Sequence, residues 1–270
     1  MTKERKIERQ IEIAAPIDAV WKALTDAEEL MHWFPLDARV TPGPGGTVWF
    51  SWGPPYEGES QIEIWDPPQH LKLKNQWGGH AEPSDRPQVA MDFTLENADG
   101  KTILRLVHSG FNSGSDWDDE FEATNRGWLQ EFLGLKHYLE HHAGEPRRAV
   151  WARVKVELSP EAVWQRIMSA DGVNLEGLKE GDSFERVTSA GERLKGRVLI
   201  CRPPEDFCAT LKNWNNAFFR VGVERFSNPR PHVEPQLWLS TYNIANSQVM
   251  SFQTSWTKLL ARLFPREFEE

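Results

Sequence analysis

The sequence has little cysteine, no long apolar run and no apolar N-terminal segment. Its two cysteines, Cys201 and Cys208, have six residues between them, so neither a disulfide framework nor a Cys-x-x-Cys redox or zinc motif can be built. Every apolar run falls short of the ~20 residues that span a bilayer, and the charged N-terminus does not resemble a secretory signal. We therefore expect a soluble, cytoplasmic protein without a membrane span.

Positive charge is also in deficit. Lysine and arginine number 31 against 40 for aspartate and glutamate, which gives a formal net charge of −9. A surface of this sign repels phosphate backbones, so nucleic acid is not expected as a partner. The sequence contains neither a P-loop nor a G-x-G-x-x-G motif, and we expect no cofactor.

Large apolar rings, by contrast, are abundant. The chain has 13 tryptophans and 14 phenylalanines but only 3 tyrosines. Much of its aromatic surface therefore carries no phenol group that would need a hydrogen-bond partner. This composition favours a fold with wide apolar walls.

Short segments recur in the same order in the two halves of the chain. The repeats are separated by 143, 136 and 128 residues, and they are Ala19-Val20-Trp21 with Ala162-Val163-Trp164, Pro67-Pro68 with Pro203-Pro204, and Trp128 with Trp256. An offset that shrinks in order indicates one fold that was duplicated and then shortened twice in the second copy. Gly144 and Pro146 are typical of a helix end and a boundary. We predict two domains, 1–144 and 145–270.

Each copy is predicted to run from a strand through a helix and a meander of strands to a long helix. In the first copy, strand-like runs near 11–13 and at 48–52, 61–65, 71–77, 89–95 and 103–108 are separated by turn residues, which favours antiparallel pairing. Helices are predicted over 27–33 and 115–142, and the second copy is predicted to begin with a strand at 154–158.

The last helix of each copy carries an apolar stripe that must pack on a sheet. In the first copy this stripe includes Phe121, Trp128 and Phe132. We therefore predict an α+β fold of two tandem domains, each a curved antiparallel sheet around a long C-terminal helix.

Several segments of the first copy also carry a family resemblance by their order and spacing. They are Ala15-Pro16 before Val20-Trp21, Trp33-Phe34, Val107-His108-Ser109-Gly110-Phe111, and Trp128 in the long helix. In these segments the chain resembles the SRPBCC (START-like, helix-grip) superfamily, and within it the branch related to the C-terminal domain of the activator of the heat-shock protein 90 ATPase.

The resemblance implies a deep pocket between the long helix and the sheet, which holds hydrophobic or aromatic small molecules, and it implies no universal catalytic residue. Trp33-Phe34 and the His-Ser-Gly segment have no counterpart in the second copy. The second domain is therefore expected to be shorter and divergent, and its cavity is in doubt.

Aromatic side chains and one histidine are the candidates for lining such a pocket in the first domain. They are Trp33, Trp49, Trp77, Phe93, His108, Trp117, Phe121 and Trp128, with Trp52 in the same aromatic set. Flat rings give a wide contact area, and His108 could form a hydrogen bond with a ligand carbonyl or hydroxyl. Side chains alternate along a strand, so the tryptophans cannot all point inward. An ordinary filled core is the competing interpretation for each ring.

One motif suggests a metal. His137-Tyr138-Leu139-Glu140-His141 matches the H-x-x-E-H pattern of one class of zinc peptidases. These residues lie at the predicted end of a helix, where cations are stabilised by the helix dipole. We therefore predict no metal site and no catalytic residue.

The sequence favours non-catalytic binding of a small hydrophobic or aromatic ligand by the first domain. Two alternatives stay open. One is a protein-partner module that activates the heat-shock protein 90 ATPase. The other is an enzyme, such as a cyclase or hydrolase, in which His108 shuttles a proton.

Overall fold

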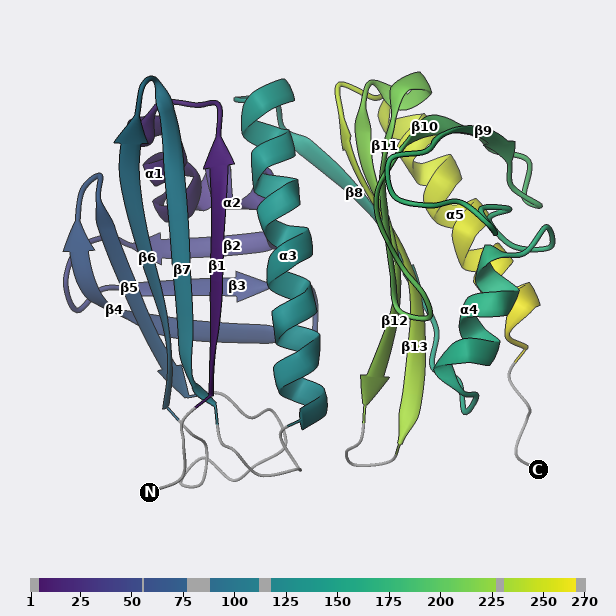
Figure 1. The fold of residues 1–270 in the computed structure, drawn as a ribbon, viewed down its shortest axis with the longest axis horizontal. Coiled ribbons are helices and arrows are strands. Elements are labelled where there is room, and N and C mark those ends of the chain that lie inside the picture. Colours follow the sequence, from purple (N-terminus) through teal and green to yellow (C-terminus); the bar gives the residue numbers. More distant parts are fainter. Residues whose placement is uncertain (1–4, 55, 77–87, 112–117, 227–230, 266–270) are drawn as a thin grey trace. The chain divides into compact units, whose positions relative to one another are not determined.

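The computed structural model describes residues 5–54, 56–76, 88–111, 118–226 and 231–265. The chain divides into two compact units, Met1–Glu145 and Pro146–Glu270, and Figure 1 shows the helices and strands of each. The boundary lies one residue after the predicted junction. Each unit is built on one antiparallel sheet with accompanying helices, so the predicted α+β class is confirmed.

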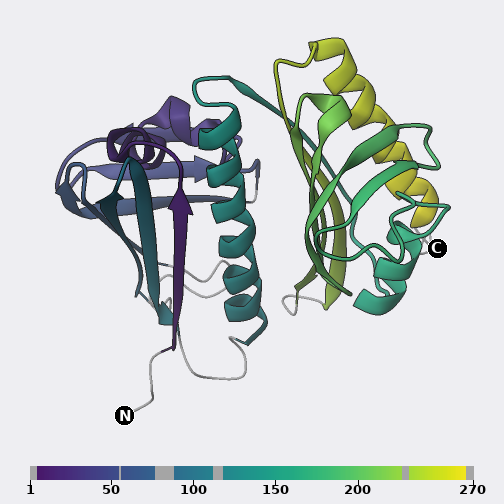
Figure 2. The ribbon, with the colours of Figure 1, turned by 45° about the horizontal axis from the view of Figure 1, so that its top comes forward.

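The first unit has a seven-stranded sheet in the order β1-β7-β6-β5-β4-β3-β2, with antiparallel neighbours throughout. Its strands are β1 (Arg5–Ile13), β2 (Asp37–Thr41), β3 (Thr47–Ser51), β4 (Glu57–Asp66), β5 (His70–Gln76), β6 (Gln88–Ala98) and β7 (Lys101–Phe111). Its helices are α1 (Ile17–Thr25), α2 (Ala27–Met31) and α3 (Asp118–His141). The sheet curves around one side of α3 (Figure 2).

Alternation along the central strands separates an inner from an outer face of this sheet. In β6, Val89, Met91 and Phe93 are buried, the alternate residues Ala90 and Asp92 are half-buried, and Thr94 and Glu96 farther along are exposed. The inner face packs against α3, whose buried side chains include Trp128, Phe132, Leu135 and Leu139. Helix and sheet therefore share one core, as the apolar stripe predicted.

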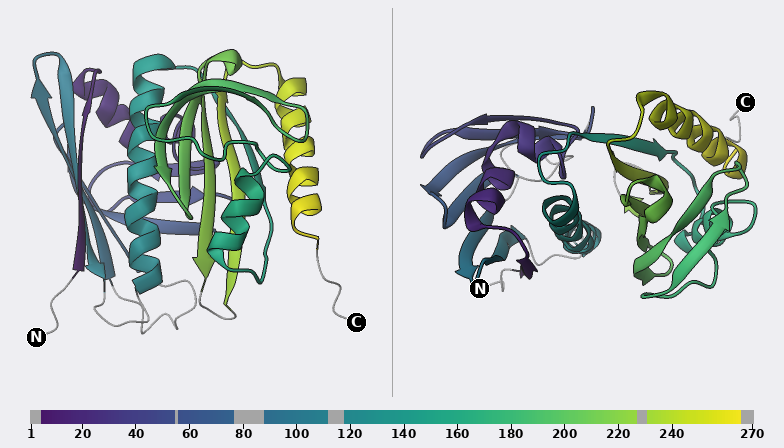
Figure 3. Two further views of the ribbon diagram at one scale, coloured as in Figure 1. Left: turned by 45° about the vertical axis from the view of Figure 1, so that its right-hand side comes forward. Right: turned by 90° about the horizontal axis from the view of Figure 1, so that it is seen from above.

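The second unit has a six-stranded antiparallel sheet in the order β8-β13-β12-β11-β10-β9. Its strands are β8 (Arg147–Arg153), β9 (Ser183–Val187), β10 (Arg193–Arg202), β11 (Asp206–Leu211), β12 (Ala217–Phe226) and β13 (His232–Tyr242), and its helices are α4 (Pro160–Met168), the 3-10 turn η3 (Lys212–Trp214) and α5 (Asn246–Leu263). Helix α5 lies along one face of the sheet (Figure 3). No helix in the described part of either unit is both long and apolar enough to cross a membrane.

Backbone geometry supports the internal repeat. The strand β4 has a register shift between Ile62 and Ile64, and β10 has the same irregularity between Val198 and Ile200, 136 residues later. The amide of Gly45 donates to the carbonyl of Ile62, and Gly181 donates to Val198 in the same way. Strands β1 and β3–β7 therefore correspond to β8 and β9–β13, and α1 and α3 correspond to α4 and α5.

The structure differs from the sequence predictions in one omitted strand and one misplaced strand. The edge strand β2 was not predicted. In the second unit, the described residues between α4 and β9 contain neither a helix nor a strand, so this unit lacks counterparts of α2 and β2. Their absence explains the first decrease in the offset between the repeats. The first strand of the second unit is β8, not 154–158. The Val154 amide donates to the Pro235 carbonyl at 3.4 Å, but Pro235 has no amide proton to donate in return. The regular pairing therefore ends at Arg153, and only an isolated Val156–Val233 bridge follows.

Candidate functional site

The indole of Trp128 lies at the centre of an aromatic cluster between α3 and the inner face of the first sheet. Its centroid is 5.9 Å from that of Phe34, 5.8 Å from that of Phe93 and 5.9 Å from that of Phe132. Phe34 comes from the turn after α2, Phe93 from β6 and Phe132 from α3 itself. Three separate parts of the fold therefore converge on one ring.

The cluster reaches solvent at one side. Phe34 stacks on Trp33 at 5.0 Å and meets Phe50 at 5.6 Å and Trp52 at 5.0 Å, edge to face. Trp33, Phe50 and Trp128 are buried, whereas Phe34 and Trp52 are only half-buried. Those two rings form the exposed rim of the cluster.

On its other side the cluster continues through His108 of β7. The His108 ring lies 4.7 Å from Phe111 and 6.0 Å from Trp128, and Phe111 meets Phe121 of α3 edge to face at 5.3 Å. The guanidinium of Arg5 covers the half-buried Phe121 ring at 4.9 Å. An imidazole is therefore held among aromatic rings, where little solvent can stabilise a charge.

Of the two ring nitrogens of His108, one has a hydrogen-bond partner and the other has none in the described residues. The Trp128 Nε1–H group donates to His108 Nδ1 at 2.9 Å, whereas Nε2 is buried and has no hydrogen-bond partner among the described residues. Only 3% of the residue is exposed. Burial lowers the pKa of His108 to about 4, so the ring is neutral at physiological pH.

Two further polar side chains on the inner face have buried atoms without a partner. The Arg9 guanidinium on β1 donates to the Asn125 backbone carbonyl at 3.3 Å and to its side chain, but its Nε has no acceptor within the described chain. Ser60 on β4 is 1% exposed, and its hydroxyl also lacks a described partner. Buried polar groups of this kind are uncommon in folded proteins.

The second unit carries apolar residues at all three corresponding positions. Val150 is 143 residues after Ile7, and these two residues pair with Leu239 and His108 respectively, so Leu239 corresponds to His108. By the same offsets, Ala152 corresponds to Arg9 and Gly196 to Ser60. A Cβ atom added to Gly196 would lie 1.8 Å from the Thr210 carbonyl oxygen, so this position admits no side chain.

The core of the second unit is one continuous cluster of buried apolar side chains. Trp256, the counterpart of Trp128, is fully buried and lies 5.3 Å from Phe219 and 5.1 Å from Phe252. Leu239 belongs to the same continuous core. Because a leucine stands where the first unit has His108, the Trp256 Nε1–H group has no acceptor in the described residues.

The structure brings together five of the eight predicted ligand-binding residues. Trp33, Phe93, His108, Phe121 and Trp128 all belong to the cluster described above. Their role in binding stays a prediction.

Of the other three predicted residues, the structure describes only Trp49, which lies outside the cluster. Trp77 and Trp117 lie outside the described residues. Trp49 faces the opposite side of the sheet from Phe50, since neighbours on a strand alternate, and its ring is covered by the Arg39 guanidinium at 4.6 Å. Trp52, from the wider aromatic set, lies at the rim.

Sequence reasoning missed Arg9 and Ser60. The one available signal was strand alternation: Arg9 and Ser60 lie an even number of residues from Ile7 on β1 and Ile62 on β4, which are buried. A charged or small polar residue in such a pattern is usually assigned to the solvent face.

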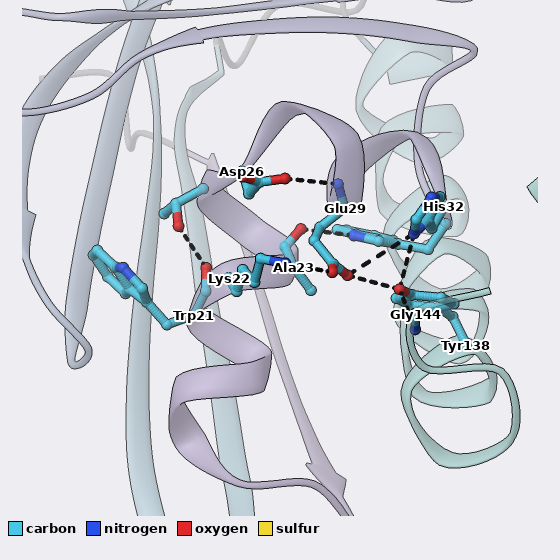
Figure 4. Close-up of polar contacts among 10 residues, drawn as sticks. Trp21, Lys22, Ala23, Asp26, Glu29, His32, Tyr138 and Gly144 are labelled. Carbon is cyan, nitrogen blue, oxygen red and sulfur yellow. Dashed lines mark hydrogen bonds and ion pairs between the residues drawn. The ribbon is translucent and has the colours of Figure 1, made fainter. Parts of the chain in front are cut away.

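A polar network joins the C-terminal end of α3 to α2 (Figure 4). The buried Tyr138 hydroxyl donates to Glu29 Oε2 at 2.6 Å, accepts from the Gly144 amide at 2.9 Å and lies 2.9 Å from His32 Nδ1. Lys22 Nζ donates to the other Glu29 oxygen at 2.9 Å. Burial alone would raise the pKa of Glu29, but the hydrogen bonds from Tyr138 and Lys22 outweigh it and lower that pKa.

The H-x-x-E-H segment shows no metal-binding arrangement. The His137 and His141 rings lie 5.0 Å apart, but Glu140 accepts from Lys136 at 2.7 Å and from the Ala14 amide at 2.8 Å. No group of three or more His, Cys, Asp or Glu residues in the described parts of the chain could hold a metal ion. The glutamate thus joins α3 to the segment between β1 and α1.

An open cleft of about 650 Å³ lies elsewhere on the first unit. It is lined by the β4–β5 turn around Pro68 and His70, by Thr94 to Asn97 of β6, by Ile17 and by Arg105. None of the predicted ligand-binding residues lines this cleft. It is therefore separate from the aromatic cluster.

Comparisons with known proteins address the first unit most directly. Residues 14–140 match the family model described as Activator of Hsp90 ATPase homolog 1-like protein. A search of curated proteins found no match.

Similar solved structures fall into two groups by coverage. The Aha1 dimer from Colwellia psychrerythraea is 24% identical, with 52% of this chain and 99% of that chain covered and a TM-score of 0.45. DynU16, a protein in the dynemicin biosynthetic locus, is 17% identical over 96% of this chain and 97% of its own, with a TM-score of 0.42. The di-domain ARO/CYC BexL from the BE-7585A biosynthetic pathway is 14% identical over 96% and 95%, with a TM-score of 0.43.

Proposed function

Given that residues 14–140 form an Activator of Hsp90 ATPase homolog 1-like domain of the SRPBCC superfamily, we propose that the first unit binds a small hydrophobic or aromatic molecule without covalent chemistry. The ligand lies between α3 and the inner face of the sheet, against the aromatic cluster around Trp128. The second unit has a structural role and binds no equivalent ligand.

The observation that carries this proposal is the position of His108. A fully buried ring nitrogen without a partner costs roughly 1–3 kcal/mol in a folded protein. Here that atom lies among Phe111, Trp128 and their aromatic neighbours. A ligand that satisfies the nitrogen and covers the rings would recover this free energy.

The difference between the two units supports the restriction to the first. The second unit is apolar at the three corresponding positions of its inner face, where Ala152, Gly196 and Leu239 are buried. The first unit instead carries Arg9, Ser60 and His108 at these positions. The half-buried Phe34 and Trp52 also give the aromatic cluster of the first unit an exposed rim.

The same geometry does not favour proton transfer by His108. Its Nδ1 accepts the Trp128 hydrogen bond, and its pKa of about 4 makes the ring a weak base near neutral pH. A cyclase or hydrolase that uses His108 as a general base would need a pKa closer to its working pH.

Native mass spectrometry and calorimetry on the full chain test the proposal. The panel consists of fatty acids, flavonoids and polycyclic aromatic ketones. We expect one bound molecule per chain for at least one class, with affinity lowered at least tenfold by Trp128→Ala. Trp256→Ala, the matched control in the second unit, should leave the affinity unchanged. Absence of binding across the panel, or two equivalent sites per chain, would contradict the proposal.

A chaperone-partner module is the second candidate, because the matched family is named for activation of the Hsp90 ATPase. This function needs no ligand and uses the outer surface of the first unit. Mixing the full chain with Hsp90 should then raise its ATPase rate, and Trp128→Phe should leave that effect intact. An unchanged rate over a range of concentrations would exclude this candidate.

A further inference from the structure

We infer that the ligand of the first unit is recognised through an oxygen acceptor that binds the His108 Nε2–H group, in a tautomer fixed by Trp128. This inference rests on the proposed function and adds the chemical class of the ligand: a planar apolar molecule with a carbonyl-type oxygen.

The tautomer follows from the direction of one hydrogen bond. The indole Nε1 of Trp128 is always a donor, since it has no available lone pair. His108 Nδ1, 2.9 Å away, must therefore accept. A neutral imidazole carries one proton, and with Nδ1 as the acceptor that proton is on Nε2.

The buried Nε2 is consequently a donor and not an acceptor. A ligand group that can only donate, such as an ammonium, would face another N–H group, whereas a carbonyl oxygen would complete the bond. Selectivity of this type is strong, because the site's donor is left unpaired when the wrong analogue binds. The Trp128 indole is thus a positioning residue, and His108 makes the contact.

The other two buried polar atoms of the first unit without a described partner, Arg9 Nε and the Ser60 hydroxyl, can also donate a hydrogen bond. The Arg9 guanidinium can only donate, and the Ser60 hydroxyl can donate as well as accept. Arg9 lies on β1, next to β7, while Ser60 lies on β4, three strands from β7 in the sheet order. At ~4.8 Å per strand, His108 and Ser60 stand roughly 14 Å apart across the sheet. The inner face is therefore best matched by an elongated molecule with more than one acceptor oxygen.

Fluorene and 9-fluorenone provide a matched pair of probes, because they share a planar three-ring frame and differ by one carbonyl oxygen. Calorimetric titration of the full chain should give a fluorenone affinity at least tenfold above that of fluorene, equivalent to about 1.4 kcal/mol. His108→Phe keeps an aromatic ring but removes the donor, so the ratio should fall to about one while both probes still bind. The control Trp256→Phe, in the second unit, should keep the wild-type ratio.

The outcomes separate the inference from the proposed function. Equal affinities of the two probes for the wild type, or a ratio that survives His108→Phe, would overturn the inference and leave the proposed function standing. Equal affinities are also the result expected if an ordered water satisfies Nε2 permanently. Absence of binding by both probes and by the wider panel would overturn the proposed function and the inference together.

A ligand-independent measurement tests the fixed tautomer. In a ¹⁵N-labelled full chain near neutral pH, the His108 signals, identified by their loss in His108→Phe, should show a protonated Nε2 and an unprotonated Nδ1. In Trp128→Phe, His108 loses its indole donor and should become a mixture of tautomers. A wild-type His108 with the proton on Nδ1, or a doubly protonated ring, would contradict the inference.

Discussion

The Trp128 indole donates a hydrogen bond to His108 Nδ1 at 2.9 Å, and the corresponding pair in the second unit, Trp256 and Leu239, forms none. The tryptophan is present in both units, but its acceptor is present only in the first. The two units therefore share a fold and a central indole, while only one retains a polar group beside it.

The first prediction compares the two indoles in the same chain. Both Trp128→Phe and Trp256→Phe lose ring volume. Trp128→Phe also leaves His108 Nδ1 without its donor, whereas Trp256→Phe removes an N–H group that has no described partner. We expect Trp128→Phe to cost about 1–3 kcal/mol more in the free energy of unfolding. Urea denaturation of the two full-length variants measures the difference, and equal losses would contradict it.

The second prediction concerns pH. Burial lowers the pKa of His108 from 6.5 to about 4, so below pH 6.5 the unfolded chain takes up the proton before the folded one does. The stability contribution of the neutral ring is therefore complete above pH 6.5 and is lost as the pH falls towards 4. The loss is about 3 kcal/mol at most.

The variant His108→Phe isolates this contribution from the other titrating groups. The difference in unfolding free energy between wild type and His108→Phe should change by up to about 3 kcal/mol between pH 7 and pH 4, to the disadvantage of the wild type. Urea denaturation at a series of pH values measures it. A difference that is independent of pH would show that His108 is not buried as a neutral ring.

The third prediction concerns the network in Figure 4. Tyr138→Phe removes the donor to Glu29 and the acceptor of the Gly144 amide. We expect a loss of about 1–3 kcal/mol in stability and a rise in the pKa of Glu29, since burial then meets less opposition from hydrogen bonds. Carboxyl-detected NMR titration measures the pKa. Lys22→Met, which removes only the exposed partner, should have the smaller effect on stability.

The fourth prediction concerns Trp49. Its ring lies on the outer face of the sheet under Arg39, so Trp49→Phe should leave the affinity for 9-fluorenone unchanged within twofold. Trp128→Ala should lower the same affinity at least tenfold. Parallel calorimetric titrations compare the two variants. A comparable loss in both would place the ligand on the other face of the sheet.

The sequence made the repeat, the antiparallel meander and the long helix predictable, because each leaves a local pattern. The shrinking offsets between Ala19-Val20-Trp21, Trp128 and their later counterparts indicated two copies of one fold. The period of the helical stripe placed Trp128 towards the sheet. Where a local pattern was ambiguous, as at residues 154–158, the pairing partner Pro235 decided the strand's end.

The site itself was only partly predictable. Trp33, Phe93, His108, Phe121 and Trp128 were expected to lie together, and they do. Trp49 was expected with them but faces outward, since a single residue shifts a strand side chain to the opposite face. The inward Arg9 and Ser60 escaped prediction because their orientation depends on pairing and packing with strands and a helix that lie far away in the chain.

By itself, then, the amino-acid order determined the class of the fold, its duplication and the identity of the apolar faces, which depend on spacing along the chain. Only the tertiary structure decided that His108 accepts from Trp128 and keeps a buried nitrogen free of described partners, and that Leu239 takes its place in the second unit. The physical reason is that a hydrogen bond between a strand and a helix depends on the packing of the two elements, which no local pattern records.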